Sequence, residues 1–344
     1  MSDSTRLRIF ASARTRQASQ RCSNVRVVLF LYINNLIHSL MSHLIPFHKE
    51  YQHADALVRL LLSRGLIIDN PVKAKQYLKT ISYYRLSAYM HPLLQAPKSA
   101  NIFKSDSNFT QVMMLYRFDK KLRLFIFNEI EKIEIALRTA IVDECVSAFN
   151  DNFWMTNALR FIDSNMFQKT LNLISHEIAK SHEEFIVHFK QTYSNLYPPA
   201  WILAEILPLG VLTKIFVNLR DMQVKKRVAL RFGLQLRVFV SWLTIITVTR
   251  NACCHHARVW NKHNTLTPMN PRRTSHAWIT LSANPLRIYY NLCIIKYFLD
   301  TISPNNDMGQ KLRDLLAVFP LVDPAAMGFP EGWKNEELWN IESD

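Results

Sequence analysis

Glycine is scarce in this sequence, with only 6 residues among 344. Turn-rich β-sheets depend on glycine because it adopts left-handed backbone conformations with little strain. The sequence also has no internal repeat and no glycine-rich loop of the kind that cradles phosphates, which excludes a P-loop nucleotide-binding site. Leucine, isoleucine, lysine, arginine and glutamate are plentiful and favour helices. The composition therefore predicts an all-α protein, with 49% apolar residues available for its core.

Long apolar runs and repeated cysteine spacings are also missing. The nearest approach to a membrane span, 238–249, is interrupted by Ser and Thr and is shorter than the roughly 20 residues needed to cross a bilayer. Five cysteines, an odd number without a repeated spacing, argue against a disulfide framework. We therefore expect no membrane-spanning segment, a reducing compartment and a cytoplasmic location.

Acidic residues are too few to balance the basic ones. The 27 Asp and Glu residues face 42 Lys and Arg residues, which leaves a formal net charge of +15. A charge of this size attracts polyanions from a distance. Nucleic acid and an anionic membrane surface both fit, and nucleic acid is the commoner partner of such proteins.

Residues 1–40 differ in character from the rest of the chain. They carry six arginines and a single acid, Asp3, before a short apolar patch. We interpret them as a disordered or mis-started extension, with Met41 as the natural first residue and 41–344 as a single domain. A signal peptide is the alternative, but the patch is short and no small-x-small cleavage site follows it. Without these residues the charge is still +10, since they contribute six positive charges and one negative.

Helix signals recur along the body of the chain. Asn70 and Pro71 predict the start of a helix that runs to about Ile81, because Asn caps a first turn and Pro fits into it. Gly65 predicts the end of the preceding helix. Further helices are expected at 50–64, 167–189, 201–219 with a disturbance at Pro208 and Gly210, 221–232, 234–260, 285–299 and 308–318.

The segment 109–149 is the longest periodic one. One face is lined by apolar residues at steps of three or four, namely Leu122, Ile126, Ile130, Ile133, Leu137, Ile141 and Cys145. An unbroken helix would be about 60 Å long, so we expect a bend or a break. Glu134 and Arg138 are spaced for an ion pair, which either is solvated or braces a functional face.

The stretch 249–261 concentrates the chemistry of the chain. It reads Thr-Arg-Asn-Ala-Cys-Cys-His-His-Ala-Arg-Val-Trp-Asn. Arg250 supplies a planar cation with several donors, suited to a negatively charged phosphorane, and His255 supplies an imidazole, which exchanges protons near neutral pH. Asn251 lies four residues before His255, so its amide can orient that ring. Arg250 and His255 are ~7.5 Å apart along a helix and can border one pocket without touching.

Bland interpretations of this stretch remain open. The adjacent residues Cys253, Cys254, His255 and His256 are zinc-ligand types, but consecutive residues cannot all point at one ion, so we expect neither metal nor cofactor. Similar Arg-to-His spacings at 85–91 and 258–263 are accidental. His256 and Arg258 are auxiliary candidates. A polar helix end without catalytic function is the alternative.

Several blocks of the chain occur in the order found in the Abi-like (abortive infection) proteins of bacteria, which this sequence resembles. They are Leu62–Leu66, Ile81–Tyr89, Leu115–Asp119, Ile133–Arg138, Trp201 with Glu205, Arg250–Asn261 and Met327–Trp333. Together they extend over roughly residues 50–340. The Arg-Asn-x-x-x-His pattern at 250–255 resembles the signature of the HEPN superfamily, to which such proteins are related.

The resemblance implies a HEPN-type helical bundle with additional N- and C-terminal helices and a metal-independent endoribonuclease that acts in phage defence. It also implies a role as the toxin of a toxin–antitoxin pair, with an RNA or protein antitoxin. Arg250, Asn251 and His255 would carry the activity. Pro208 stands where the family tends to have a small polar residue, and Cys254 stands where alanine is usual.

RNA is therefore the substrate we expect, cut by attack of its 2′-hydroxyl. Four cations on the short helix before the motif are expected to contact RNA phosphates: Lys225, Lys226, Arg227 and Arg231. Each chain has one convincing motif, whereas cleavage commonly needs separate acid and base groups. We therefore expect a homodimer with a composite active site; the rival is a monomer that uses Arg85 and His91.

Two other functional classes are kept as alternatives. In the first, the chain is a non-catalytic helical module that binds RNA or a protein. In the second, it is a membrane-associated protein anchored through residues 1–40.

Overall fold

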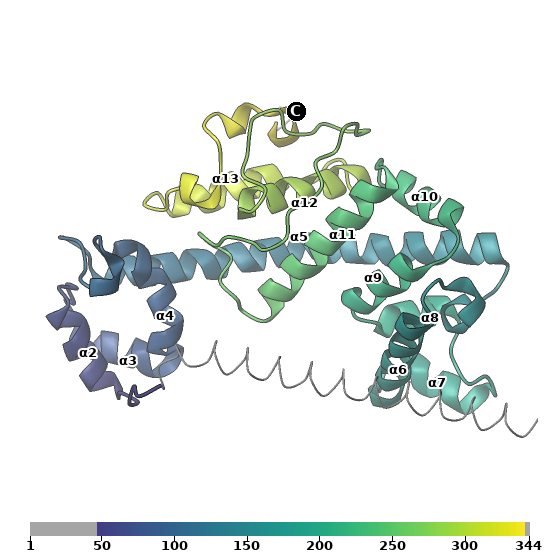
Figure 1. The fold of residues 1–344 in the computed structure, drawn as a ribbon, viewed down its shortest axis with the longest axis horizontal. Coiled ribbons are helices and arrows are strands. Elements are labelled where there is room, and N and C mark those ends of the chain that lie inside the picture. Colours follow the sequence, from purple (N-terminus) through teal and green to yellow (C-terminus); the bar gives the residue numbers. More distant parts are fainter. Residues whose placement is uncertain (1–46, 341–344) are drawn as a thin grey trace, which may run out of the picture. The chain divides into compact units, whose positions relative to one another are not determined.

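The computed structural model describes residues 47–340, and it confirms the predicted all-α fold (Figure 1). Among these residues there are twelve α-helices and no strand, only three isolated bridges. The compact unit begins at Ala54. The helices are α2 (Ala54–Ser63), α3 (Pro71–Ile81), α4 (Tyr83–Met90), α5 (Phe109–Phe149), α6 (Ser164–Lys180), α7 (Glu184–Thr192), α8 (Ala200–Ile206), α9 (Leu209–Asn218), α10 (Met222–Arg231), α11 (Leu236–Cys254), α12 (Ile288–Ile302) and α13 (Met308–Val318). The predicted extension at 1–40 lies outside the described residues.

Helix α5 is the axis of the unit. It is one continuous helix of 41 residues, so of the predicted bend or break, the break is wrong (Figure 1). It contains neither proline nor glycine, and its first turn is closed by a capping box between Asn108 and Gln111. The predicted apolar stripe is buried throughout, and helices α4, α8, α10, α11 and α12 pack along it. Partners on several sides support a length that the sequence pattern alone did not justify.

Local capping signals are confirmed where they were predicted. The Asn70 side chain accepts a hydrogen bond from the backbone N–H of Lys73, and Pro71 occupies the first turn of α3. Gly65 follows α2 with a left-handed φ of +86°. Pro208 separates α8 from α9, as its missing N–H requires.

Two helices end well before the last residue that the sequence predicted for them. The segment 167–189 is not one helix, because α6 stops at Lys180 and α7 starts at Glu184. Ser181 is extended, and its hydroxyl accepts from the N–H of Glu183, a local turn that competes with helix continuation. The predicted helix 234–260 ends at Cys254, with consequences for the site.

Membrane-spanning character is weak in the described part of the chain. Within residues 47–340 no individual helix combines the length and the apolarity of a membrane span. Only α10 and α11 taken together satisfy such a test, and these two helices are bent by 67° relative to each other.

Candidate functional site

Arg250 is held against α5 by a carboxylate that it shares with a second arginine. Its Nε atom lies 3.3 Å from Oε2 of Glu134, and Glu134 also pairs with Arg138. Arg138 donates to the carbonyl oxygens of Ala204 and Leu207 at the end of α8. The predicted Glu134–Arg138 pair is confirmed, and it is a brace rather than a solvated pair, because its side chains are only 12% and 13% exposed. Two guanidinium groups face one carboxylate, so the cluster keeps one positive charge.

Arg250 is only partly enclosed by this cluster. Its side chain is 27% exposed, and the guanidinium carbon lies 6.0 Å from the centroid of the Phe127 ring. Its Nε atom has no hydrogen-bond partner of good geometry in the described part of the chain. An ion pair and an aromatic ring therefore position Arg250, while part of the guanidinium remains open to an anion.

His255 lies at the end of α11 rather than within a helix. It is the C-cap residue and is exposed, and its backbone N–H donates to the carbonyl of Asn251 at 2.9 Å. Among the hydrogen bonds of residues 47–340, none joins the Asn251 amide to the His255 ring. The predicted orienting bond is therefore not formed.

The helix ends here because His256 adopts a left-handed conformation. Its φ is +55°. The N–H groups of His256 and Ala257 bond back to the carbonyls of Cys253 and Ala252 at 3.2 and 2.9 Å, which is a Schellman motif. Arg85 donates to the His256 carbonyl at 2.7 Å. Neither glycine nor proline marks this end, which is why periodicity predicted a longer helix.

A buried carboxylate holds the segment after α11. Asp119 on α5 is fully buried, and its Oδ1 atom accepts from the backbone N–H groups of Val259 at 3.0 Å and Trp260 at 2.7 Å. Its Oδ2 atom accepts from the Tyr89 hydroxyl at 2.5 Å and from Arg123. Burial and the Asp119 charge raise the pKa of Tyr89 well above its usual value, so Tyr89 stays a proton donor. Asp119 thus joins α4, α5 and the motif.

Sequence reasoning gave Asp119 no role beyond its place in a family-like block. The sequence does contain a signal for Asp119, because Leu115, Asp119 and Leu122 are spaced by four and three residues along one helix face. The structure shows that all three are buried. An acid therefore stands where the stripe predicts an apolar side chain, and a buried acid needs donors or cations. Its motif partners lie 140 and 141 residues away in the sequence, where no local pattern reveals them.

Helix α4 holds the same segment from another side. Arg258, predicted as an auxiliary residue, donates to the Ala88 carbonyl at 2.9 Å. The rings of Tyr89 and Trp260 stack with centroids 6.2 Å apart. Two tyrosines of this helix differ, because Tyr89 is 1% exposed whereas Tyr84 is 89% exposed. The backbone of the motif is therefore fixed from α4 and α5 together.

A small pocket of about 80 Å³ lies beside α11. Arg258 and Lys262 contribute cations to its lining, and Arg250 and His255 do not line it. Two lining amide atoms, Nδ2 of Asn264 and Oδ1 of Asn291, are buried without hydrogen-bond partners among the described residues. A donor and an acceptor are thus available to a small polar ligand or an ordered water.

The basic segment predicted to contact RNA is mostly occupied by contacts within the fold. Lys225 is 7% exposed and donates to the Val217 and Leu219 carbonyls at the end of α9, and burial lowers its pKa. Arg227 pairs with Glu144, and Arg231 pairs with Asp143 and Glu144, all across to α5. Lys226 is exposed and makes no ion pair with the described residues. RNA contact by this segment stays a prediction, with Lys226 as its most available cation.

The described residues contain no group of three or more His, Cys, Asp and Glu side chains placed to share a metal ion. Cys253 is buried, and burial raises the pKa of its thiol to about 12, so it remains protonated at neutral pH. Cys254 is half-buried, and neither forms a disulfide. The site is therefore composed of arginine, imidazole, amide and carboxylate groups.

One protein family matches the part of the chain that contains this candidate site. The model of the family described as Abi-like protein matches residues 76–261, more than half of the chain. The matched region includes Tyr89, Asp119, Glu134 and the whole motif to Asn261. No curated protein and no solved structure matches the chain.

Proposed function

The chain belongs to the Abi-like protein family, and on that basis we propose that it acts in abortive infection as a metal-independent endoribonuclease of HEPN type. Family membership supports the role in abortive infection. The observation that carries the proposed activity is the end of α11, where an exposed imidazole, His255, follows a partly open arginine by five residues. Asp119 fixes the backbone at Val259 and Trp260, just after these groups, while His255 is exposed and Arg250 is partly exposed.

In the proposed reaction His255 removes the proton from a ribose 2′-hydroxyl. The 2′-oxygen then bonds to the adjacent phosphorus, and the bond from phosphorus to the 5′-oxygen breaks. The 5′-oxygen takes up a proton, and the products end in a 2′,3′-cyclic phosphate and a 5′-hydroxyl. The open part of the Arg250 guanidinium stabilises the negative charge that builds up on the phosphorane. Asn251 orients the imidazole once RNA is bound.

We propose that a second chain supplies the group that protonates the leaving oxygen. Three apolar side chains exposed on α5 support this: Leu124, Phe127 and Ile135 are 55%, 38% and 59% exposed. Phe127 is the ring beside Arg250, so a copy docked against these side chains would bring two motifs together. Mixing excess His255→Ala chains with active ones tests this, because shared sites lose activity faster than dilution predicts. Strictly proportional activity from exchanging subunits contradicts the dimer.

The activity is tested by incubating the purified protein with end-labelled RNA in EDTA. We expect cleavage to proceed without metal and to leave 2′,3′-cyclic phosphate ends, and His255→Ala to abolish it. Cleavage that requires an added divalent ion contradicts the proposed mechanism. The substrate RNA, an RNA or protein antitoxin and a cytoplasmic location belong to the same proposal.

A non-catalytic module that binds RNA or a protein is the second candidate. One observation favours it, because Arg250 is paired with Glu134 and the His255 ring has no orienting bond from Asn251. In that case Arg250 is a structural residue. Saturable RNA binding without any cleavage, unchanged by His255→Ala, decides for the module.

A further inference from the structure

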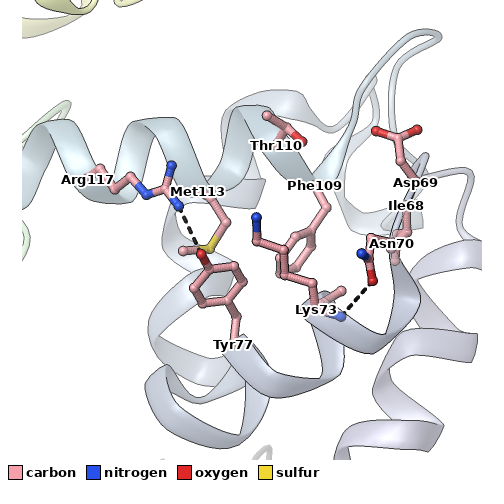
Figure 2. Close-up of a pocket in the computed structure, with 10 residues that line it drawn as sticks. Ile68, Asp69, Asn70, Lys73, Tyr77, Phe109, Thr110, Met113 and Arg117 are labelled. Carbon is pink, nitrogen blue, oxygen red and sulfur yellow. Dashed lines mark hydrogen bonds between the residues drawn. The ribbon is translucent and has the colours of Figure 1, made fainter.

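A second polar pocket lies between α3 and the first turns of α5. Its volume is about 200 Å³. Figure 2 shows its polar side chains converging from two helices, with Lys73 and Tyr77 on α3 and Thr110 and Arg117 on α5. None of its lining residues belongs to the motif at 249–261.

The lining is rich in hydrogen-bond donors. The Lys73 ammonium group extends into the space between Tyr77 and Phe109 (Figure 2). Arg117 donates from Nη2 to the Tyr77 hydroxyl oxygen at 2.9 Å. Because that oxygen accepts from Arg117, its own proton is available to a ligand. The remaining Arg117 N–H groups and the Thr110 hydroxyl add further donors.

The positive charge of this pocket is not neutralised within the described part of the chain. Neither Lys73 nor Arg117 belongs to an ion pair among residues 47–340, in contrast to Arg227 and Arg231 on α10. Asp69 is the one carboxylate of the lining, and in Figure 2 it lies at the rim, directed away from Lys73. Two cations and one acid leave the pocket with a net charge of +1.

The aromatic part of the lining is pre-organised. The rings of Tyr77 and Phe109 stack with centroids 6.4 Å apart and an interplanar angle of 29°. Phe109 is buried, and this packing fixes the position of the Tyr77 hydroxyl beside Arg117. The Tyr77 hydroxyl and Arg117 are therefore held together before any ligand binds, which reduces the entropy that these two groups lose on binding.

We propose that this pocket binds a phosphate group, as a site separate from the motif. A phosphate offers several acceptor oxygens and a negative charge, which match an ammonium, a guanidinium and two hydroxyl groups. The phosphate can come from a free ion, a terminal phosphomonoester or the diester backbone of an RNA strand. The inference does not depend on RNA cleavage.

Isothermal titration of the full-length protein tests the proposal with three probes: inorganic phosphate, a 2′-O-methyl oligoribonucleotide with a 5′-phosphate, and the same oligomer with a 5′-hydroxyl. The 2′-O-methyl groups prevent cleavage, so the ribonuclease proposal can fail without affecting the result. The test variant is Lys73→Gln with Arg117→Gln. Lys79→Gln is the matched control, because Lys79 is exposed on the same helix and does not line the pocket.

We expect the double variant to bind the recognised probe at least about tenfold more weakly, since two charge-assisted contacts are lost. Lys79→Gln should change its affinity less than about twofold. A pocket-dependent preference for the 5′-phosphorylated oligomer identifies a terminal monoester; equal pocket-dependent binding of both oligomers identifies the diester; pocket-dependent binding of inorganic phosphate alone identifies the free ion.

Tyr77→Phe is a second test, which removes one donor and keeps both charges. We expect it to weaken binding several-fold with an unchanged circular dichroism spectrum. The proposal is overturned if no probe binds saturably, if the double variant binds all three like the wild type, or if Lys79→Gln weakens binding as much as the double variant does.

Discussion

Helix α10 and the end of α11 both concentrate cations, yet they use them in opposite ways. On α10, Lys225 is buried against backbone carbonyls, and Arg227 and Arg231 pair with acids of α5. After the end of α11, the Asp119 carboxylate accepts hydrogen bonds from the backbone, and His255 remains exposed. A count of basic residues therefore does not give the charge available to a ligand, because neighbouring elements decide which cations are neutralised.

The largest expected effect is a loss of RNA cleavage, without a loss of folding, when Arg250 or His255 is replaced. We predict that Arg250→Ala and His255→Ala each lower RNA cleavage by about 10²–10⁴-fold, because one removes a charge-stabilising group and the other a proton-transfer group. Helical content should be unchanged, and cellular toxicity should be lost with the cleavage. Cleavage rates and circular dichroism of the purified variants provide the check.

His256→Gly is the matched control for His255→Ala. His256 contributes a left-handed backbone position, which glycine adopts without strain, so the helix end is preserved. We expect its cleavage rate to stay within a few-fold of the wild type. Loss of activity in this variant, with full activity in His255→Ala, would mean that His256 is the working imidazole.

The next prediction concerns the free energy of unfolding after replacement of either of two carboxylates of α5. Asp119→Asn should lower the free energy of unfolding by about 3 kcal/mol, because it leaves Arg123 buried without its counter-charge. Asp143→Asn removes only an exposed pair with Arg231 and should cost less than about 1 kcal/mol. Urea denaturation of both variants measures the difference. Equal losses would show that Asp119 is not the scaffold of the motif.

Smaller effects, on the salt dependence of RNA affinity and on the melting temperature, distinguish the cations of α10. If this helix contacts RNA, Lys226→Gln should reduce the slope of log affinity against log salt by about 0.7, the value for one phosphate contact on a single strand. Lys225→Gln should instead lower the melting temperature, because its ammonium group bonds two carbonyls. An unchanged slope for Lys226→Gln places the RNA elsewhere on the surface.

The features that the sequence predicted correctly depend on residues that are close together in the chain. The cap at Asn70, the interruption at Pro208, the Glu134–Arg138 pair and the bounds of α13 each depend on residues within a few positions of one another. The sequence predicted that α11 extends beyond its real end at Cys254, because a histidine with positive φ, rather than a glycine, ends the helix. The unbroken length of α5 depends on packing against several other helices, and the apolar periodicity of its own sequence does not contain this information.

The sequence proposed the residues of the candidate site but not the contacts that support them. Arg250, Asn251 and His255 were proposed from their residue types, their spacing and the family resemblance, and their catalytic role stays a prediction. The contacts that position them, from Glu134 and Asp119, join residues more than 100 positions apart in the sequence. A separation of 83 positions likewise explains why the neutralisation of Arg227 by Glu144 was not predicted.

In the proposed reaction, the end of α11 uses the 2′-hydroxyl of RNA as the nucleophile. Two oligoribonucleotides in EDTA that differ in one atom, the 2′-oxygen at the nucleotide 5′ to the cut, provide the decisive comparison. We predict that the all-ribose strand is cut at that bond by the wild-type protein and that the strand with a single 2′-deoxynucleotide is not cut there. Equal cleavage of the two strands at that position would contradict the mechanism.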